Sequence, residues 1–476
     1  MLSLEYLLLN TVPGAETGRK VTSMRQAVVV IHGIGEQKPM DTVRAFVDAV
    51  MPLPSNPVKP KFWSKPNPMS ALFELRKLVT PQSRTMPPTD FYEYYWAYQA
   101  RGTKFVHVIS WAWILLVRRP KNVPHHLKVL WLTLWFLILS TATLISTGYG
   151  GGLVTLGGKA ISANQLLTIL SSALLLVISG LILNYVGDAA RYLNPSPPNI
   201  DMRRRIRAEG VELLRELHKC EQYDRVILVG HSLGSVIAYD IVRNLWPEYN
   251  TVHAKLPGID QKALHELESD GKALAANPTP ELADKFRNEQ SALWIEQRKQ
   301  GNSWLVTDLI TVGSPLAHAE LLLARTKDEL RERQTEREFP TCPPVPDEGL
   351  YSYPLTYDVN GEQRTFYALH HGAVFASTRW TNIYFPAGLG FFGDLVGGPL
   401  GEIFGHGVRD VPVDSAEWSG WLKRFPMIHT HYWSKDTVLQ GSHDSPTAWA
   451  LEILRKTLDL ESRTWLREAE PNQKQP

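Results

Sequence analysis

The chain has 476 residues, and its 50 basic and 48 acidic side chains leave a formal net charge of +2. This balance argues against a nucleic-acid partner, and the length predicts a large core with insertions or a second domain. Only two cysteines are present, Cys220 and Cys342, and neither lies in a Cys/His cluster. We therefore expect no disulfide framework, a reducing compartment, no metal and no cofactor.

The N-terminal part predicts the beginning of an α/β domain. Residues 2–9 lack a basic leader, so they are interpreted as a strand or packing segment and not as a secretory signal. The apolar run 26–31 predicts a buried strand that ends in a glycine-rich turn, His32 to Gly35, before a helix over 41–50. The proline-rich residues 52–68 predict a surface excursion, and 90–97 predict an aromatic-rich strand.

Two long uncharged stretches follow, at residues 129–147 and 166–186. Each is long enough to cross a bilayer, so they predict a two-helix transmembrane hairpin, with buried core helices as the alternative. The flanking residues are rich in Lys and Arg, which predicts a multi-pass membrane protein with both ends of the hairpin and the catalytic domain on the cytoplasmic side. The shorter uncharged run 105–117 predicts an interfacial, re-entrant or packed helix.

The next stretch has the pattern strand, sharp turn, helix. An amphipathic helix over 202–219 precedes the apolar strand 225–229, and the helix 233–246 follows. Between the strand and this helix lies Gly-x-Ser-x-Gly at 230–234, in which small residues allow a tight turn that exposes the hydroxyl of Ser232. The alternative is a structural serine in a turn.

The remaining chain predicts further strands with long connections. Residues 247–303 predict a mostly helical cap, with Thr279-Pro280-Glu281 as a helix start. Strands are expected at 305–312, 381–385 and 408–413, a second excursion at 325–379, a glycine-rich loop at 388–407, a helix at 446–460 and a frayed tail at 466–476.

A nucleophilic serine needs an imidazole to take its proton and a carboxylate to orient that imidazole. In doubly wound hydrolases the order along the chain is serine, acid, histidine. Asp394 is the preferred acid here, with Asp410 and Asp414 as alternatives, and the histidine is His429 or His431. The backbone N–H groups of Leu233 and Ile34 are the predicted oxyanion donors.

Six motifs together resemble the α/β-hydrolase superfamily, and more narrowly the lipase-like serine hydrolases of bacteria. In relatives the histidine precedes a Tyr-Trp pair by three residues, which favours His429 over His431. The resemblance implies hydrolysis of carboxylic esters, including lipid or acyl esters. The motifs are HGIGEQ at 32–37, YEYYWA at 92–97, GHSLG at 230–234, GSP at 313–315, WTNIY at 380–384 and HTHYW at 429–433.

These predictions combine into a membrane-anchored serine esterase with an α/β-hydrolase fold, a mostly parallel doubly wound sheet. The expected partners are a lipid bilayer and a small-molecule or lipid ester. An acyltransferase, thioesterase or amidase with the same triad, and an inactive membrane scaffold, are the alternatives. The expected organisation is a first part of the catalytic domain at 1–100, a membrane insertion at 101–200, a main part at 201–465 and the tail.

Overall fold

A computed structural model of the chain describes most of the residues outside 101–196. The described ranges are 24–33, 38–52, 60–70, 72–80, 86–100, 197–250, 260–324, 326–359, 361–387, 393–394, 396–413, 426–433 and 446–461. Within 101–196 they are 153–156, 159–162 and the single residues 120, 123, 128, 131, 132, 135, 136, 138, 139, 142, 169 and 192.

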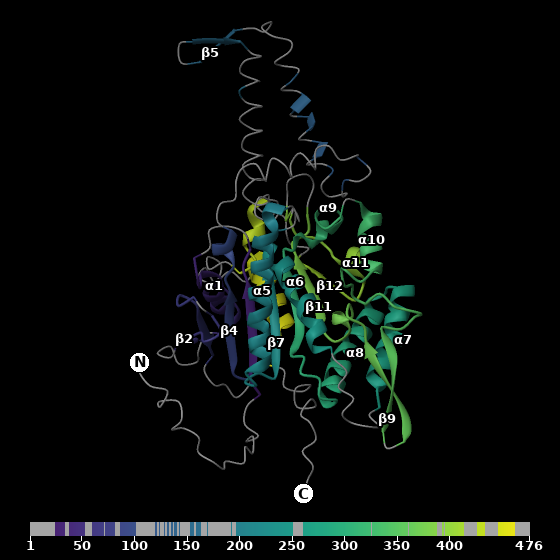
Figure 1. Cartoon of the computed structure of the whole chain (residues 1–476). Helices are drawn as coiled ribbons and strands as arrows, with labels where there is room; N and C mark the ends of the chain where they lie inside the picture. Colours follow the sequence, from purple (N-terminus) through teal and green to yellow (C-terminus); the bar gives the residue numbers. More distant parts are fainter. Residues whose placement is uncertain are drawn as a thin grey trace.

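The described residues form a mixed α/β fold around a mostly parallel sheet, which confirms the predicted class (Figure 1). The strand order is β12-β11-β8-β7-β1-β4-β3-β2. Its strands are β1 (Gln26–Ile31), β2 (Trp63–Pro66), β3 (Arg76–Val79), β4 (Thr89–Tyr94), β7 (Arg225–His231), β8 (Val306–Val312), β11 (Arg379–Tyr384) and β12 (Arg409–Pro412). Only β2 and β3 run antiparallel to their neighbours.

The three central strands are buried along almost their whole length, which explains why the sequence shows them as continuous apolar runs. Every residue of β1 and β8 is buried, and so are the first six positions of β7. A strand covered on both faces cannot alternate apolar with polar residues. In parallel register, Ile31 of β1 lies beside Gly230 of β7, so the loop after β1 and the loop after β7 leave the sheet at the same edge.

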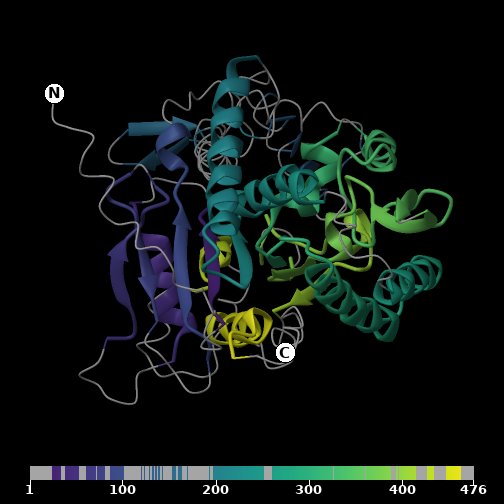
Figure 2. The ribbon, with the colours of Figure 1, turned by 60° about the horizontal axis from the view of Figure 1, so that its bottom comes forward.

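Helices cover both faces of the sheet (Figure 2). On one face α5 (Pro197–Lys219) packs against α6 (Leu233–Tyr249), and on the other α1 (Asp41–Val50) packs against α13 (Pro446–Leu458). Two separate clusters of buried apolar side chains correspond to the two faces. Among the described residues the remaining helices are α7 (Lys262–Ala276), α8 (Pro280–Lys299), α9 (Ala319–Leu322), α10 (Lys327–Thr335) and α11 (Gly401–Phe404), and the short 3-10 helices are η2 (Ala97–Ala100), η5 (Pro315–His318), η6 (Val374–Ala376) and η8 (Pro426–Thr430).

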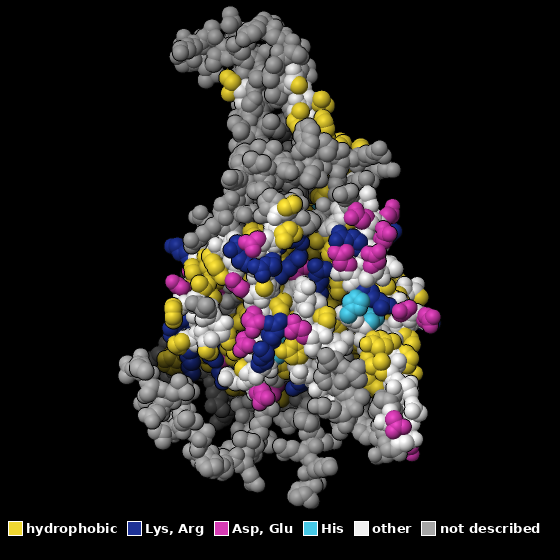
Figure 3. Space-filling model, in the orientation of Figure 1, with side chains coloured by type: hydrophobic (Ala, Val, Ile, Leu, Met, Phe, Trp, Pro, Cys, Tyr) yellow, Lys and Arg dark blue, Asp and Glu magenta, His cyan; other side chains and the backbone are white. Residues whose placement is uncertain are grey.

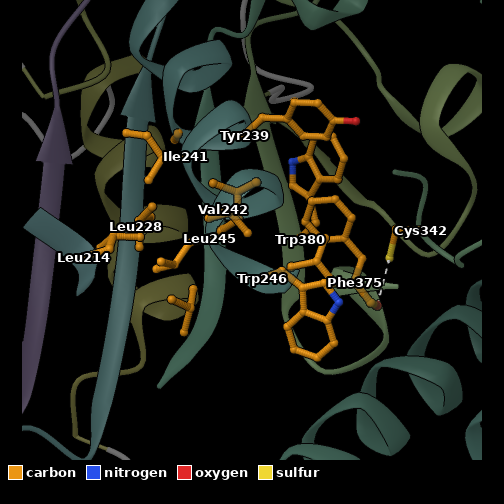
Figure 4. Packing of buried hydrophobic residues seen from close by; sticks show 14 of the residues in the cluster. Leu214, Leu228, Tyr239, Ile241, Val242, Leu245, Trp246, Cys342, Phe375 and Trp380 are labelled. Atoms are coloured by element: carbon orange, nitrogen blue, oxygen red, sulfur yellow. Dashed lines mark hydrogen bonds between the residues drawn. The ribbon is translucent and has the colours of Figure 1, made fainter. Parts of the chain in front are cut away.

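Aromatic rings fill the core between α6 and the end of the sheet that contains β11 (Figure 4). Trp380 is fully buried; its ring centroid lies 4.6 Å from that of Phe375 and 5.3 Å from that of Tyr239. Its indole N–H donates to the hydroxyl of Thr311 at 3.1 Å. Trp380 therefore contributes both packing and a satisfied buried hydrogen bond.

Replacement of the Trp380 side chain is expected to cause a large loss of stability. We expect Trp380→Ala to lower the free energy of unfolding by about 3–5 kcal/mol, because it opens a cavity and leaves Thr311 without its donor. Urea unfolding measures this value. Trp63→Ala is the matched control: Trp63 lies on edge strand β2 with 56% of its surface exposed, and we expect a change below about 0.5 kcal/mol. Equal losses in both variants would contradict the packing described.

A buried ion pair connects α5 with α6. Asp240 of α6 accepts from the guanidinium of Arg207 at 2.9 Å and from the hydroxyl of Tyr192 at 2.8 Å. Arg207 belongs to a basic stretch of α5, visible as the dark blue band over the upper part of that helix in Figure 3. Asp240 thus helps to hold the helix that follows Ser232.

The described residues of the first predicted insertion are mostly helical, as expected, and the second insertion contains regular structure as well. α7 and α8 pack together within the predicted cap, and Thr279 caps α8 by accepting from the N–H of Leu282. The segment 325–379, expected to be a second excursion, contains α10 and an antiparallel hairpin, β9 (Ser352–Val359) and β10 (Glu362–Leu369). The Asn-Gly pair at 360–361 is a hairpin signal that sequence reasoning overlooked.

The described residues contradict the predicted membrane localisation. Within the described ranges, no helix is both long and apolar enough to span a bilayer. A long stretch with few or no charges favours a spanning helix, but the stretch must also form one continuous helix, and the sequence pattern alone does not ensure that. Between the two stretches the chain forms a small hairpin, β5 (Leu153–Leu156) with β6 (Lys159–Ser162).

Several predictions fall outside the described residues. Most of the stretches 129–147 and 166–186 does so, as do residues 2–9 and 105–117 and the tail from 466. Ile34 and Asp414 also lie there.

Candidate active site

Ser232 occupies a strained position between β7 and α6. Its backbone has φ 52° and ψ −129°, a region that side-chain-bearing residues rarely adopt and that costs on the order of 1–3 kcal/mol. Its N–H donates to the carbonyl oxygen of Val312 at 2.9 Å, which ties the turn to the end of β8. Such strain persists where the surrounding structure enforces it, and it is typical of functional turns.

The two glycines of the motif are required by close approach of backbone. A Cβ at Gly230 would lie 2.5 Å from the carbonyl oxygen of Gly234, and a Cβ at Gly234 would collide with the carbonyl oxygens of Ile31 and His32. Because these obstacles are backbone atoms, they cannot move aside as a flexible side chain would. Glycine at both positions thus allows the turn to close against the end of β1.

His429 and Asp394 form a buried hydrogen-bonded pair. Nδ1 of His429 lies 2.9 Å from Oδ2 and 3.0 Å from Oδ1 of Asp394. The carboxylate also accepts from the N–H groups of Val396 and Gly397 and, at 2.8 Å, from the hydroxyl of Tyr432. Burial raises the pKa of Asp394, but the charge of His429 and these hydrogen bonds outweigh it and lower the pKa to about 2. The carboxylate is therefore ionised at neutral pH.

The alternative residues lie in other surroundings. Asp410 accepts from the amide of Asn382 at 2.7 Å and from the N–H groups of Leu400 and Gly401 at the start of α11, so its carboxylate is part of a helix terminus. His431 is partly exposed, and its Nδ1 lies 3.2 Å from the hydroxyl of Thr430. Of the predicted acids and histidines that are described, Asp394 and His429 are the ones that the structure brings together.

Close approaches at Gly313 and Gly33 show that Ser232 and the His429–Asp394 pair lie in the same loop cluster. A Cβ at Gly313, the residue after Val312, would lie 3.0 Å from Cε1 of His429 and 3.1 Å from Oδ2 of Asp394. A Cβ at Gly33 would lie 2.8 Å from the Cβ of Ser232. The loops after β1, β7 and β8 therefore meet around the serine, with the imidazole beside Gly313.

The loop after β1 is anchored by His32. Its ring stacks on Trp96 with 5.1 Å between ring centroids, and its carbonyl oxygen accepts from the indole N–H of Trp96 at 2.9 Å. Burial lowers the pKa of His32 to about 4, so the ring is neutral. Its Nε2 accepts from the N–H of Trp96, which leaves Nδ1 to donate to the carbonyl oxygen of Gly33. His32 thus braces the predicted oxyanion loop.

Of the two predicted oxyanion donors, Leu233 lies among the described residues. Leu233 is the first residue of α6, so its N–H has no acceptor within the helix and lies at the positive end of the helix dipole. Ile34 is outside the described residues, whereas Gly33, directly before it, lies against Ser232.

His231 contacts the backbone of His429. Its Nε2 lies 2.9 Å from the carbonyl oxygen of His429, and burial, followed by the charge of His429, lowers its pKa to about 3. A neutral ring beside a carbonyl oxygen must carry its proton on Nε2. His231 therefore donates to the backbone of His429 and holds η8 against β7.

Glu93 is a buried carboxylate that the sequence reasoning did not single out. It lies at the end of β4, 2% exposed, and accepts hydrogen bonds from the N–H of Met40 and from Thr42 at the start of α1. The chain between His32 and α1 is thus held at both ends, by Trp96, two residues after β4, and by Glu93 of β4. Within the aromatic run 91–96 Glu93 is the one acid, and this is the signal that could have identified it.

The raised pKa of Glu93 is expected to make the free energy of unfolding depend on pH. Burial raises its pKa from 4.5 to about 7, although the bonds from Met40 and Thr42 act in the opposite direction. Between these two pH values the folded chain binds more protons than the unfolded chain, so the free energy of unfolding falls as pH rises, by up to about 3 kcal/mol. We expect Glu93→Gln to remove this component. Urea unfolding of both proteins from about pH 5 to about pH 8 tests it, and parallel pH profiles would contradict it.

Tyr432 is a second residue absent from the predicted set. Its hydroxyl donates to Asp394 and accepts from the N–H of Phe385 at 3.0 Å, so it links the acid to the end of β11. The Tyr-Trp pair after His429 was noted only as a landmark for the histidine.

Searches against protein-family models, curated proteins and solved structures give no match for this chain. The functional assignment therefore rests on the geometry of the site.

Proposed function

We propose that the chain is a serine hydrolase of the α/β-hydrolase fold that cleaves carboxylic esters through an acyl-enzyme. The observation that supports this most is the strained Ser232 between β7 and α6, in the same loop cluster as a buried His429–Asp394 pair. A histidine that is oriented by an ionised carboxylate next to a serine on a sharp turn is the arrangement that nucleophilic acyl transfer requires.

Each side chain has a defined task in this proposal. Nδ1 of His429 is turned to Asp394, which leaves Nε2 to take the proton as Ser232 Oγ attacks the carbonyl carbon. The oxyanion that forms accepts from the N–H of Leu233 and from the loop that begins at Gly33. His429 then returns the proton to the departing alkoxide, so that an alcohol leaves and an acyl-Ser232 ester remains.

The second half of the reaction reverses the roles. His429 takes a proton from water, the hydroxide attacks the acyl carbon, and the proton returns to Ser232 as the carboxylic acid leaves. Asp394 stays ionised throughout, because its low pKa prevents it from taking the proton from the imidazolium. No step requires a group from outside the chain other than water.

Turnover of p-nitrophenyl esters with acyl chains of increasing length tests this proposal. We expect an initial burst of p-nitrophenol, because acylation precedes hydrolysis, and a competing thioester or amide should react more slowly than the matched ester. Adding an alcohol or amine acceptor distinguishes acyl transfer from hydrolysis, since a transferase would give the new ester or amide as the main product. A complete absence of turnover and burst would overturn the proposal.

A further inference from the structure

A group of arginines lies at the opposite edge of the sheet from Ser232, where β8, β11 and β12 begin. In the strand register Asp308 pairs with Arg379, and Thr381 pairs with Arg409. Paired residues and residues two apart along a strand point to the same face, so these four side chains share one face of the sheet. Arg287 joins them from α8, and its Nη2 donates to the hydroxyl of Thr381 at 2.8 Å.

Positive charge exceeds negative charge in this group. Asp308, 1% exposed, accepts from Arg225 at 2.8 Å and from Arg379 at 2.8 Å, so two guanidiniums already share its carboxylate. Arg287 lies 4.0 Å from the same carboxylate, and Arg225 also donates to the backbone carbonyl oxygen of Asp459. Three arginines therefore share the Asp308 carboxylate, and the charge of Asp459 also acts on Arg225 and Arg379. Arg409 adds a fourth positive charge, so the arginines outnumber these two acids.

Arg287 and Arg409 are the two members with unused hydrogen-bonding groups. Nη1 of Arg287 is buried and has no acceptor among the described residues. The exposed side chain of Arg409 likewise makes no hydrogen bond or ion pair with any described residue. Burial, and then the charges of Arg379 and Arg409, lower the pKa of Arg287 to about 10. The two arginines thus repel each other across Thr381, and a buried N–H group without an acceptor, as at Nη1 of Arg287, is costly.

An oxyanion between these side chains removes both costs. Guanidinium groups bind phosphate through paired N–H donors, and such bonds are stronger than those between neutral groups. The Thr381 hydroxyl accepts from Arg287 and keeps its own proton for a further bond to an anion. Phosphate fits this donor set better than a carboxylate, because it offers oxygens in three directions.

We propose that Arg287, Arg409 and Thr381 bind a phosphate group, either as the free ion or as a phosphomonoester. The site is formed at the amino ends of β11 and β12, whereas Ser232 follows the carboxyl end of β7. It is therefore separate from the proposed ester hydrolysis and does not depend on it.

Calorimetric titration of the full chain with inorganic phosphate and with methyl phosphate, at constant ionic strength, tests this site. We expect saturable binding, weakened about tenfold or more in Arg409→Gln because one charged hydrogen-bonding group is lost. Arg364→Gln, which removes a partly exposed arginine on β10, is the control and should bind as the wild type does. Because Arg409 is exposed, we expect its variant to fold as the wild type does, and thermal unfolding checks this.

The outcomes separate the sources of the phosphate group. Binding of both probes identifies the phosphate group itself as the ligand, and binding of methyl phosphate alone identifies a monoester. Binding that Arg409→Gln and Arg364→Gln weaken equally, or no saturable binding of either probe, would overturn the proposal. None of these readouts uses ester turnover, so failure of the proposed hydrolase activity leaves this test unaffected.

Discussion

Replacing Ser232 with alanine is expected to abolish ester turnover, with a loss in kcat on the order of 10⁶-fold and little change in KM. The hydroxyl is the only group lost, and it is the group that attacks the carbonyl carbon of the ester. The strained backbone of the turn stays the same, because alanine also bears a Cβ and the glycines on either side are unchanged. Steady-state kinetics on p-nitrophenyl esters measures the effect.

The control for this substitution is Ser303→Ala, which changes an exposed serine before β8. We expect it to retain wild-type turnover and wild-type unfolding. If Ser232→Ala kept more than a small fraction of the activity while remaining folded, the nucleophile would have to be another residue.

Asp394→Asn is expected to lower kcat by about 10⁴-fold, because an amide beside Nδ1 of His429 can donate to it and so favours the wrong tautomer. The amide also cannot stabilise the imidazolium that forms when His429 takes the proton. Asp394 is fully buried and Tyr432 donates to it, so water cannot replace the lost charge.

Asp410→Asn provides the matched comparison, since it makes the same chemical change in the other predicted acid that the structure describes. Asp410 accepts from the backbone at the start of α11, so we expect a loss of stability of about 1–2 kcal/mol and nearly unchanged kcat. Kinetics together with urea unfolding distinguishes the two variants. A larger kinetic effect for Asp410→Asn than for Asp394→Asn would exchange their roles.

Much of the sheet could be predicted from the sequence because its central strands are buried on both faces. The predicted strand at 26–31 and helix at 41–50 have the bounds of β1 and α1, and 305–312 differs from β8 by one residue. The edge strand β2 and its neighbour β3 were missed, since Trp63 to Pro66 of β2 is mostly exposed and polar and gives no apolar run. Edge strands lack the pattern that burial imposes.

The order of residues along the chain identified some residues of the candidate site but not all of them. Ser232 and the order of an acid and a histidine after it led to Asp394 and His429, which are hydrogen-bonded in the structure. Spacing could not separate Asp394 from Asp410, because only the fold determines that Asp410 faces the start of α11. Glu93 and Tyr432 act through contacts between distant segments, which no local pattern encodes.

The membrane prediction failed for a related reason. Residues 129–147 and 166–186 lack charge, and this local property was taken to imply two spanning helices. No helix in the described parts of the chain meets the requirement of length and apolarity together. The inferred cytoplasmic orientation depended on the same two helices, so it has no separate support.

The role of Ser232 as the nucleophile is tested most directly by locating a trapped covalent adduct. The full-length protein is treated with a fluorophosphonate, digested, and analysed by mass spectrometry of its peptides. We expect a single phosphonylated residue, Ser232, and loss of the label in both Ser232→Ala and His429→Ala, because the unactivated hydroxyl reacts too slowly. Labelling of a different residue, or no labelling of a folded wild-type protein, would contradict the proposed serine hydrolase.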